Sequence, residues 1–204
     1  MNDSLPRLKG TVRMLHAAAG APNVDIYSNG NPIAMNLAFG KATDYKDFSP
    51  GKNKIQIYTA GTYDNPIYSE DIEIMPNDIV TISIALLESD ISLFTLKDGT
   101  STGNPQQSFL RFINLSTNAP LLTLSLPNGD TLFNGVEYLE TTGYYNLSPG
   151  IYDFLLTATG ASALRFFIKQ INLRPGSFHT LYIIGLLNNT PRLGSLFLKD
   201  GFES

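Results

Sequence analysis

The residues of this chain best suited to acid–base chemistry are His16 and Asp25. The chain has 204 residues, with two histidines and no cysteine. His16 ends one apolar segment and Asp25 lies in the next, so their side chains meet if the two segments form neighbouring strands. An imidazole–carboxylate hydrogen bond orients a general base. A hydrolase that uses His16 and Asp25 is therefore one hypothesis.

The alternative for this pair is a structural bond that holds a strand end to the following loop. No serine in the first half lies in a nucleophile motif such as G-x-S-x-G. The second half has Asn114 and Thr123 where the first has His16 and Asp25, so the fold does not require the pair. We expect a structural pair and no enzyme.

Tyrosines are the candidates for ligand binding: Tyr58, Tyr63, Tyr68, Tyr144 and Tyr145. The first three cluster around the predicted loop 61–65, and the last two are adjacent in the sequence. Exposed aromatic faces stack on sugar rings or anchor a protein partner. The competing interpretation is that these rings pack against cross-strand neighbours on a sheet.

Two arginines and the second histidine suggest less specific chemistry. Arg13 and Arg111 occupy equivalent positions in the two halves. They could form a shared anion site in each half. We expect instead that their stems pack on an outward sheet face or strand edge. His179 lies in an apolar segment without a second ligand at metal-binding spacing. The run Asp98–Asn104 is rich in oxygen ligands but lacks the EF-hand spacing for calcium. We expect no metal and no cofactor.

An internal repeat organises the chain around these residues. The stretch Val12–Gly30 returns in altered form as Leu110–Gly129, and each copy opens a unit that ends in the letters LKDG. A repeat of about 100 residues is a duplicated domain, because solenoid repeats are shorter. The predicted domains are residues 1–103 and 104–204.

Short alternating segments and turn residues predict the fold class. Lys54–Tyr58 alternates with Ile55 and Ile57 on one side. Asn29-Gly30 is typical of a type I′ hairpin and Ser49-Pro50-Gly51 of a type II turn. With no amphipathic helix and turn signals every 8–12 residues or so, the sequence predicts an all-β protein of two tandem immunoglobulin-like antiparallel β-sandwich domains, each with seven or eight strands.

Composition excludes several classes of partner. The net charge of -4 and the lack of a basic run exclude nucleic-acid binding. The longest apolar runs, Ile82–Leu87 and Leu181–Leu187, are far shorter than the roughly 20 residues of a transmembrane helix, so we expect no transmembrane segment. Met1 is followed by polar residues instead of a signal peptide, so either the protein is cytosolic or the sequence begins after a removed signal.

The run VRMLHAAAGAPNVDIYSNG resembles the opening of the DUF4397 family, a domain of unknown function found in bacterial extracytoplasmic and surface proteins, often in tandem. The matching positions are Val12, Arg13, His16, Ala17, Ala21, Pro22, Val24, Asp25, Ile26, Tyr27, Asn36, Leu37, Phe39, Gly40, Asp44, Tyr45, Pro50 and Gly51. The second half is placed mainly through its likeness to the first. The resemblance implies a location outside the cytoplasm and no specific activity.

The resemblance and the missing catalytic motif together favour a non-catalytic extracytoplasmic protein, secreted or a surface-anchored lipoprotein. It would serve as an adhesion, scaffold or binding module for a protein or glycan of the cell envelope. Its signal sequence is absent from this sequence, and a lipid anchor would be carried by a removed N-terminal segment. The alternative within binding is a glycan-binding module that uses the exposed tyrosines.

Overall fold

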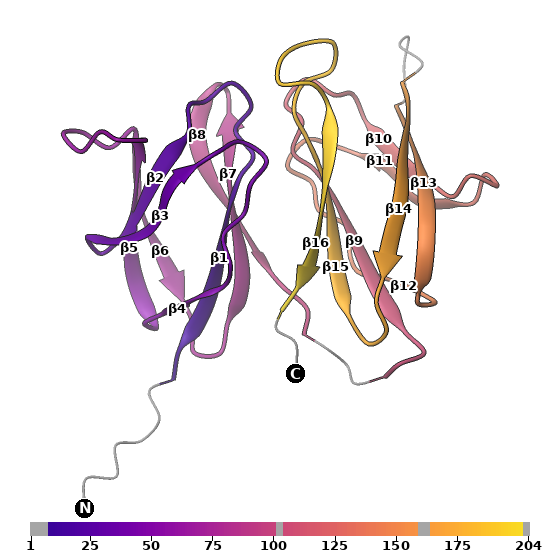
Figure 1. The fold of residues 1–204 in the computed structure, drawn as a ribbon, viewed down its shortest axis with the longest axis horizontal. Coiled ribbons are helices and arrows are strands. Elements are labelled where there is room, and N and C mark those ends of the chain that lie inside the picture. Colours follow the sequence, from indigo (N-terminus) through magenta and orange to yellow (C-terminus); the bar gives the residue numbers. More distant parts are fainter. Residues whose placement is uncertain (1–7, 101–103, 159–163, 202–204) are drawn as a thin grey trace, which may run out of the picture. The chain divides into compact units, whose positions relative to one another are not determined.

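The structure is a computed structural model that describes residues 8–100, 104–158 and 164–201. All of the regular structure in these residues is β-strand, which confirms the predicted all-β class and the two sandwich units. The chain divides into the compact units Met1–Lys97 and Asp98–Ser204. In each unit two four-stranded sheets face one another (Figure 1).

The first unit contains eight strands in two sheets, ordered β4-β1-β7-β8 and β3-β2-β5-β6. The strands are β1 (Gly10–His16), β2 (Val24–Ser28), β3 (Asn31–Leu37), β4 (Lys46–Phe48), β5 (Gly51–Thr59), β6 (Tyr68–Ile74), β7 (Ile79–Leu87) and β8 (Asp90–Lys97).

The second unit repeats this order, with sheets β12-β9-β15-β16 and β11-β10-β13-β14. Its strands are β9 (Ser108–Asn114), β10 (Leu122–Ser125), β11 (Thr131–Val136), β12 (Tyr145–Leu147), β13 (Gly150–Ala158), β14 (Arg165–Leu173), β15 (Phe178–Ile184) and β16 (Gly194–Asp200). Each strand of the second unit thus has a counterpart in the first.

Each unit contains one parallel strand pair, which the sequence did not predict. β1 pairs with β7 in parallel from Thr11↔Ile79 to His16↔Ile84, and β9 pairs with β15 in the same way. The other pairings of these sheets are antiparallel. A parallel pair needs a crossover connection. Strands β2, β3, β5 and β6, which form the opposite sheet, lie within the connection between β1 and β7.

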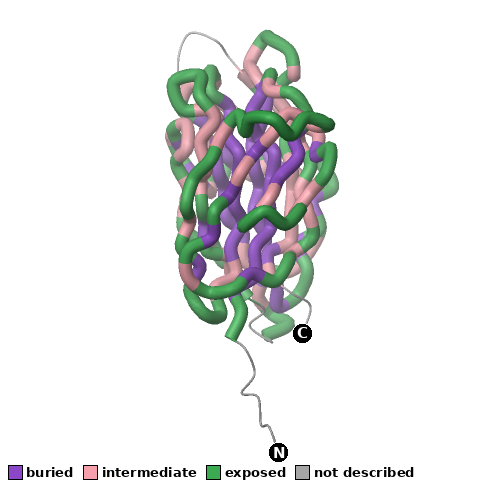
Figure 2. Tube along the Cα trace, turned by 90° about the vertical axis from the view of Figure 1, so that its left-hand side faces the viewer, coloured by how far each residue is buried: buried purple, intermediate pink, exposed green. Residues whose placement is uncertain are grey.

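The core of each unit lies between its two sheets. In β5 the alternation predicted from the sequence holds, with Ile55 and Ile57 fully buried and Lys54 exposed. Such inward-facing positions carry the hydrophobic stabilisation, at about 25 cal/mol per Å² of apolar surface removed from water. Figure 2 shows buried residues along the strands and exposed residues at the turns.

The turns of the two units differ more than their sequences suggest. Asn29 and Gly30 both have positive φ, 51° and 78°, as a type I′ turn requires. In the corresponding Asn128-Gly129 pair only Gly129 does. Likewise Gly51 has a φ of 98°, whereas Gly150 of the repeated Ser-Pro-Gly sequence is not among the residues with positive φ. The same short sequences therefore adopt different turn conformations in the two units.

The boundary between the units lies at Lys97/Asp98, before the predicted 103/104. Its position has a physical cause in two bonds made with the second unit. The Asp98 carboxylate accepts a hydrogen bond from Arg111, and the Gly99 amide donates to the Tyr144 hydroxyl. In the described part of the chain, no helix is long and apolar enough to cross a membrane.

Candidate functional site

Asp25 holds two backbone segments together. The side chain is buried, and its two oxygens accept hydrogen bonds from different amides: Oδ1 from Asn36 N (2.6 Å) and Oδ2 from Gly61 N (2.8 Å). Asn36 has a φ of 52° at a register shift between β2 and β3, and Gly61 starts the loop after β5. Asp25 therefore fixes a bulge and a loop to the middle strand between them.

His16 makes a separate contact. Its buried ring lies within hydrogen-bond distance of the Pro22 carbonyl, with Nε2 at 2.9 Å from that oxygen, and packs edge-on against Phe39. Burial lowers the pKa of His16, although the Pro22 carbonyl acts in the opposite direction. Within the described residues no hydrogen bond joins His16 to Asp25. The arrangement thus lacks the imidazole–carboxylate dyad that a hydrolase mechanism through this pair needs.

In the second unit, neutral side chains occupy the positions that correspond to Asp25 and His16. Thr123 Oγ1 accepts a hydrogen bond from Gly135 N (3.1 Å), and Gly135 has positive φ at the bulge that corresponds to Asn36. Asn114, the counterpart of His16, accepts from Ser116 N (3.0 Å) and donates to the Val136 carbonyl (3.3 Å). The position of Asp25 and Thr123, opposite the bulge, therefore needs a hydrogen-bond acceptor and not a particular residue.

Arg13 and Arg111 alternate with core residues of β1 and β9, so they lie on the outward face of their sheets as expected, but both are buried there. Arg13 Nε donates to Thr81 Oγ1 (2.9 Å) and the guanidinium lies over the Tyr45 ring, 4.6 Å from its centroid. Arg111 repeats both contacts with Thr180 and Tyr144. A guanidinium tolerates burial where hydrogen bonds, ring faces and carboxylates replace water.

Tyr144, which is half-buried, packs and bonds within this cluster. Its hydroxyl donates to Asp200 Oδ2 (2.8 Å), which also accepts from Thr180 and lies 3.6 Å from Arg111 Nη2. Burial, followed by the Asp200 charge, raises the pKa of Tyr144. The Tyr144 hydroxyl is therefore engaged within the protein, while the residue as a whole is half-buried.

Three tyrosines form an aromatic surface on the solvent side of the β3-β2-β5-β6 sheet. The rings of Tyr27, Tyr58 and Tyr63 have centroids 5.6 to 6.4 Å apart, and Tyr63 is 57% exposed. Gln56 donates to the Tyr58 hydroxyl (3.1 Å). Desolvation and then a hydrogen bond with Tyr63 raise the pKa of Tyr27. We call Tyr27, Tyr58 and Tyr63 the tyrosine surface.

The sequence pointed to Tyr58 and Tyr63 but missed Tyr27. The signal was available in the alternation of β2, since Tyr27 follows Asp25 on the side opposite the buried Val24 and Ile26. What the sequence could not supply is the pairing Asp25↔Tyr58 and Tyr27↔Gln56 between β2 and β5, which brings the rings together.

The remaining predicted tyrosines lie elsewhere. Tyr68 packs against the first core, and its hydroxyl donates to Glu70 (2.7 Å) and contacts Ser92 and the backbone of Leu93 on β8. Tyr145 is 46% exposed in the second unit and packs edge-on against Phe133. The predicted set of five is therefore divided, with two in the tyrosine surface.

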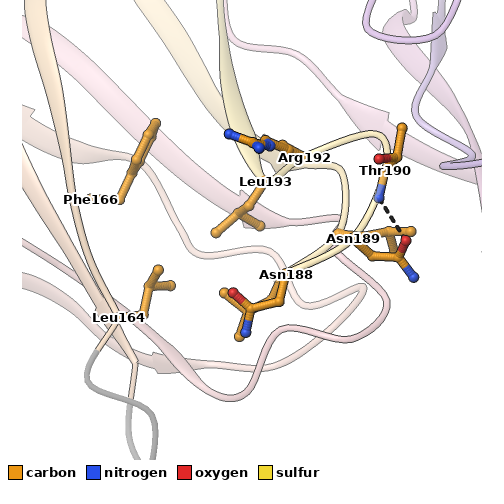
Figure 3. Close-up of a pocket in the computed structure, with 9 residues that line it drawn as sticks. Leu164, Phe166, Asn188, Asn189, Thr190, Arg192 and Leu193 are labelled. Atoms are coloured by element: carbon orange, nitrogen blue, oxygen red, sulfur yellow. Dashed lines mark hydrogen bonds between the residues drawn. The ribbon is translucent and has the colours of Figure 1, made fainter.

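A hollow of about 540 Å³ lies beside the loop between β15 and β16 (Figure 3). Leu164 and Phe166 line one side, facing Leu193 and Asn188, and the Arg192 guanidinium extends over the space. Its volume is in the range of small-ligand sites, and its lining combines leucines and Phe166 with the polar residues Asn188, Asn189, Thr190 and Arg192. Sequence analysis missed it, because its walls are joined only when the start of β14 lies beside the loop.

The loop that forms this hollow is held by its own hydrogen bonds. Leu186 N donates to the Pro191 carbonyl and Leu193 N to the Leu186 carbonyl, both at 2.8 Å. The Asn118 amide makes reciprocal bonds with the Leu187 backbone, at 2.7 and 3.0 Å. A Cβ on Gly185 would lie 2.2 Å from the Arg192 carbonyl oxygen, so only glycine fits at the first corner. The hollow is preformed.

His179 lies inside the second sandwich, 1% exposed and stacked on Phe197 at 5.1 Å. Its Nδ1 is 3.4 Å from the Ser108 hydroxyl, and its Nε2 has no hydrogen-bond partner. Burial lowers its pKa to about 4. Ser108 is fully buried, so this serine–histidine contact offers no nucleophile to a substrate in solvent.

The described residues contain no group of three or more His, Cys, Asp or Glu side chains that could hold a metal ion. Asp98, the first residue of the run considered for calcium, directs its carboxylate to Arg111 at 2.6 Å. Residues 101–103 of that run lie outside the described residues.

Two of the solved structures that match this chain have low sequence identity to it and low TM-scores. The C-terminal domain of AlgF from P. aeruginosa is 24% identical with a TM-score of 0.35, and the match covers 46% of this chain and 98% of that domain. The Bacillus anthracis TIE protein is 14% identical with a TM-score of 0.26 over 92% of this chain, which spans about a third (34%) of that protein. No curated protein matches the sequence.

The family comparison is more informative. Residues 10–125 match the model of the family described as a domain of unknown function (DUF4397). The match begins at β1 and runs through the first unit to the end of β10, which is more than half of the chain. The chain therefore belongs to the DUF4397 family.

Proposed function

We propose that this protein is a non-catalytic binding module that works outside the cytoplasm, and that the tyrosine surface of the first unit binds a glycan. The observation that carries the proposal is the group of three tyrosine rings on the solvent side of one sheet. Its partly exposed members present apolar faces with phenolic hydroxyls at their edges, which suits a sugar ring with its own apolar face and polar rim.

Polar groups beside the rings support a sugar ligand over a purely apolar one. A hollow of about 370 Å³ next to Tyr63 is lined by Met35 and Asn36, among others. The Asn36 side chain accepts a bond from Asn23 (2.8 Å), and Gln56 bonds to Tyr58 (3.1 Å). Carboxamides beside aromatic rings supply donors and acceptors for sugar hydroxyls. No charged ligand is needed to account for this surface.

The non-catalytic part of the proposal is supported by the places of the candidate catalytic residues. Asp25 has both oxygens on backbone amides, and His16 faces the Pro22 carbonyl. A general base must reach the proton it removes, and both side chains are fully buried, including the second ring nitrogen of His16, which has no hydrogen-bond partner. A His16→Ala variant should change only thermal stability; loss of a hydrolytic activity found with the wild type on substrate panels would refute this part.

A glycan array tests the ligand class. Wild-type protein is expected to bind at least one glycan, with the signal lost in Tyr63→Ala because Tyr63 is the most exposed ring of the surface. Tyr145→Ala is the matched control, since Tyr145 is similarly exposed but lies in the second unit. Absence of binding by the wild type would exclude the glycan, and equal binding by Tyr63→Ala would exclude this surface.

Family membership supports the location, because the resemblance to DUF4397 noted in the sequence implies a place outside the cytoplasm. Fractionation of the source cells tests it. Recovery of the protein with the envelope or the medium is expected, and recovery with the cytoplasm alone would contradict the proposal.

A further inference from the structure

A second hollow, of about 330 Å³, lies along the edge of the second sandwich formed by β14 and β16. These are the end strands of the two sheets. Its lining is contributed by the end of β14, the start of β15 and the end of β16: Gln170, Asn172, Arg174, His179, Phe197 and Lys199. The tyrosine surface lies in the other unit, so this hollow is independent of the proposed glycan site.

The lining combines positive charge with hydrogen-bond donors. Arg174 and Lys199 are cationic, Gln170 and Asn172 carry carboxamides, and no carboxylate lines the hollow. Lys199 lies directly opposite His179 in the β15–β16 register, so their side chains share the inner face of the sheet. Such a set of groups is complementary to an anion.

An unsatisfied buried atom in the lining also indicates a ligand. His179 Nε2 is buried without a hydrogen-bond partner, and leaving a buried polar group unpaired is unfavourable. Ser108, on the neighbouring strand β9, lies beside the other ring nitrogen, Nδ1. The Ser108 hydroxyl also has the Ser177 carbonyl as an acceptor, at 3.4 Å. In the protonated ring both nitrogens carry a proton, so Nε2–H of the imidazolium is a donor that an anion would satisfy.

We propose that this hollow binds a small oxoanion of the phosphate–sulfate class, held by Lys199, Arg174 and the Nε2–H of His179. The carboxamides of Gln170 and Asn172 donate to the remaining oxygens. A pocket of this size accommodates a tetrahedral anion with part of a larger molecule or with water.

The charges around His179 agree with this assignment. Burial lowers its pKa most, the Asp200 charge and a hydrogen bond with the Phe109 backbone raise it, and Lys199 and Arg174 lower it by smaller amounts. Asp200 itself accepts hydrogen bonds from Tyr144 and Thr180. Bound dianion would offset the two cations and favour the protonated imidazole, so anion binding and His179 protonation are coupled.

The first unit lacks this combination and serves as an internal comparison. By strand register Val80 corresponds to His179, Glu73 to Asn172, and Met75 to Arg174. Lys97, the counterpart of Lys199, forms an ion pair with Asp78 at 3.0 Å. Lysine occupies this register position in both units, so the groups that only the second unit supplies are His179, Asn172 and Arg174.

The presence of two histidines in the chain makes the test direct. The imidazole C–H signals of His16 and His179 are followed by NMR against pH, in sodium sulfate and in sodium chloride of equal ionic strength. Sulfate is expected to raise the pKa of His179 by about one unit or more, which corresponds to about tenfold tighter binding to the protonated form, and to leave His16 unchanged. A His179→Gln variant assigns the signals.

Lys199→Gln should remove most of the sulfate effect, and Arg174→Gln provides a second variant if the first does not fold. Arg192→Gln, which removes a cation from the other hollow, is the control and should respond like the wild type. Phosphate should act like sulfate, and acetate should not. The proposal is overturned if sulfate shifts His179 no more than chloride does, if acetate is equally effective, or if both cation variants keep the full response.

Discussion

The two units have the same strand order but close the edge between their sheets differently. In the first unit, Tyr68 of β6 packs on the core and its hydroxyl reaches Ser92 and Leu93 of β8 across that edge. In the second, the corresponding residue is Phe166 of β14, which has no hydroxyl and lines the larger hollow. In the first unit a tyrosine side chain covers this edge, whereas in the second unit the edge has a hollow.

The connection between the last two strands of each unit also differs, being tight in the first unit and longer in the second. β7 and β8 are joined by a tight turn at Glu88 and Ser89, both with positive φ. β15 and β16 are joined by the longer loop 185–193, whose own hydrogen bonds hold it beside Leu164 and Phe166. The shared sheets are thus a scaffold, and loops and edge residues are where function is added to such folds.

The largest expected effect concerns the residue that holds the bulge in each unit. Asp25→Ala leaves two amide groups, Asn36 N and Gly61 N, without their acceptor and should lower the free energy of unfolding by about 2–5 kcal/mol. Thr123→Ala removes the acceptor of a single amide, Gly135 N, and should cost about 1 kcal/mol. Urea unfolding followed by circular dichroism measures both values.

Asp25→Asn keeps one side-chain oxygen as an acceptor and should fall between the wild type and Asp25→Ala. If Asp25→Ala and Thr123→Ala lowered the free energy of unfolding equally, the carboxylate and the hydroxyl would contribute equally to stability. The two units would then not differ at this position.

A smaller effect is expected at the loop that the first unit lacks. Gly185→Ala places a methyl group 2.2 Å from the Arg192 carbonyl oxygen at a φ of 86°, and should cost about 2–3 kcal/mol while shifting the NMR signals of Leu193 and Phe166. Gly30→Ala also has positive φ but open space around it, and should cost only about 1 kcal/mol.

If Gly185→Ala left the signals of the hollow in place and cost no more than Gly30→Ala, the loop would be adaptable. The hollow in Figure 3 could then not be described as preformed.

The sealed edge of the first unit is tested by Tyr68→Phe. Loss of the phenolic hydroxyl removes its bond to Glu70 and its contacts with β8, and should cost about 1 kcal/mol. Hydrogen exchange should become faster at Ser92 and Leu93. Phe166→Tyr is the reverse exchange and should leave stability nearly unchanged; protection of β8 that persists in Tyr68→Phe would show that the hydroxyl does not seal the edge.

Local signals in the sequence were sufficient for the strands and insufficient for the sites. Two local patterns located strands of the β3-β2-β5-β6 sheet: the alternation around Ile55 and Ile57, and the Asn29-Gly30 turn. Both could be found because period and turn chemistry are local properties. The parallel pairing of β1 with β7 joins segments far apart in the chain, and no local pattern specifies it.

The sites depend on that long-range pairing. Tyr144 and Tyr145 are adjacent in the sequence, yet one bonds to buried Asp200 and the other is exposed, because neighbours in an extended chain face opposite sides. His179 was judged only by its apolar surroundings in sequence. Its register with Lys199 on β16, which places the two side chains together, appears only in the folded sheet.

The smallest expected effect is a pH dependence contributed by the two histidines, one in each unit. Burial lowers the pKa of His179 to about 4 and also lowers that of His16, so both are neutral in the folded protein near pH 7. An unfolded histidine titrates near pH 6.5. Below that pH the unfolded chain binds more protons than the folded one, so this stability is complete above about pH 6.5 and is lost as the pH falls toward 4.

Each histidine can be exchanged for the residue that the other unit carries. His179→Val installs the counterpart of Val80, and His16→Asn the counterpart of Asn114. The loss of unfolding free energy from pH 7 to pH 5, measured by urea unfolding in chloride buffer, should be smaller in each variant than in the wild type, by roughly 1 kcal/mol for His179→Val once solvent screening is allowed for. A wild-type slope that persists in His179→Val would mean that His179 takes up its proton at the same pH in the folded and the unfolded protein, which its burial against Phe197 does not allow.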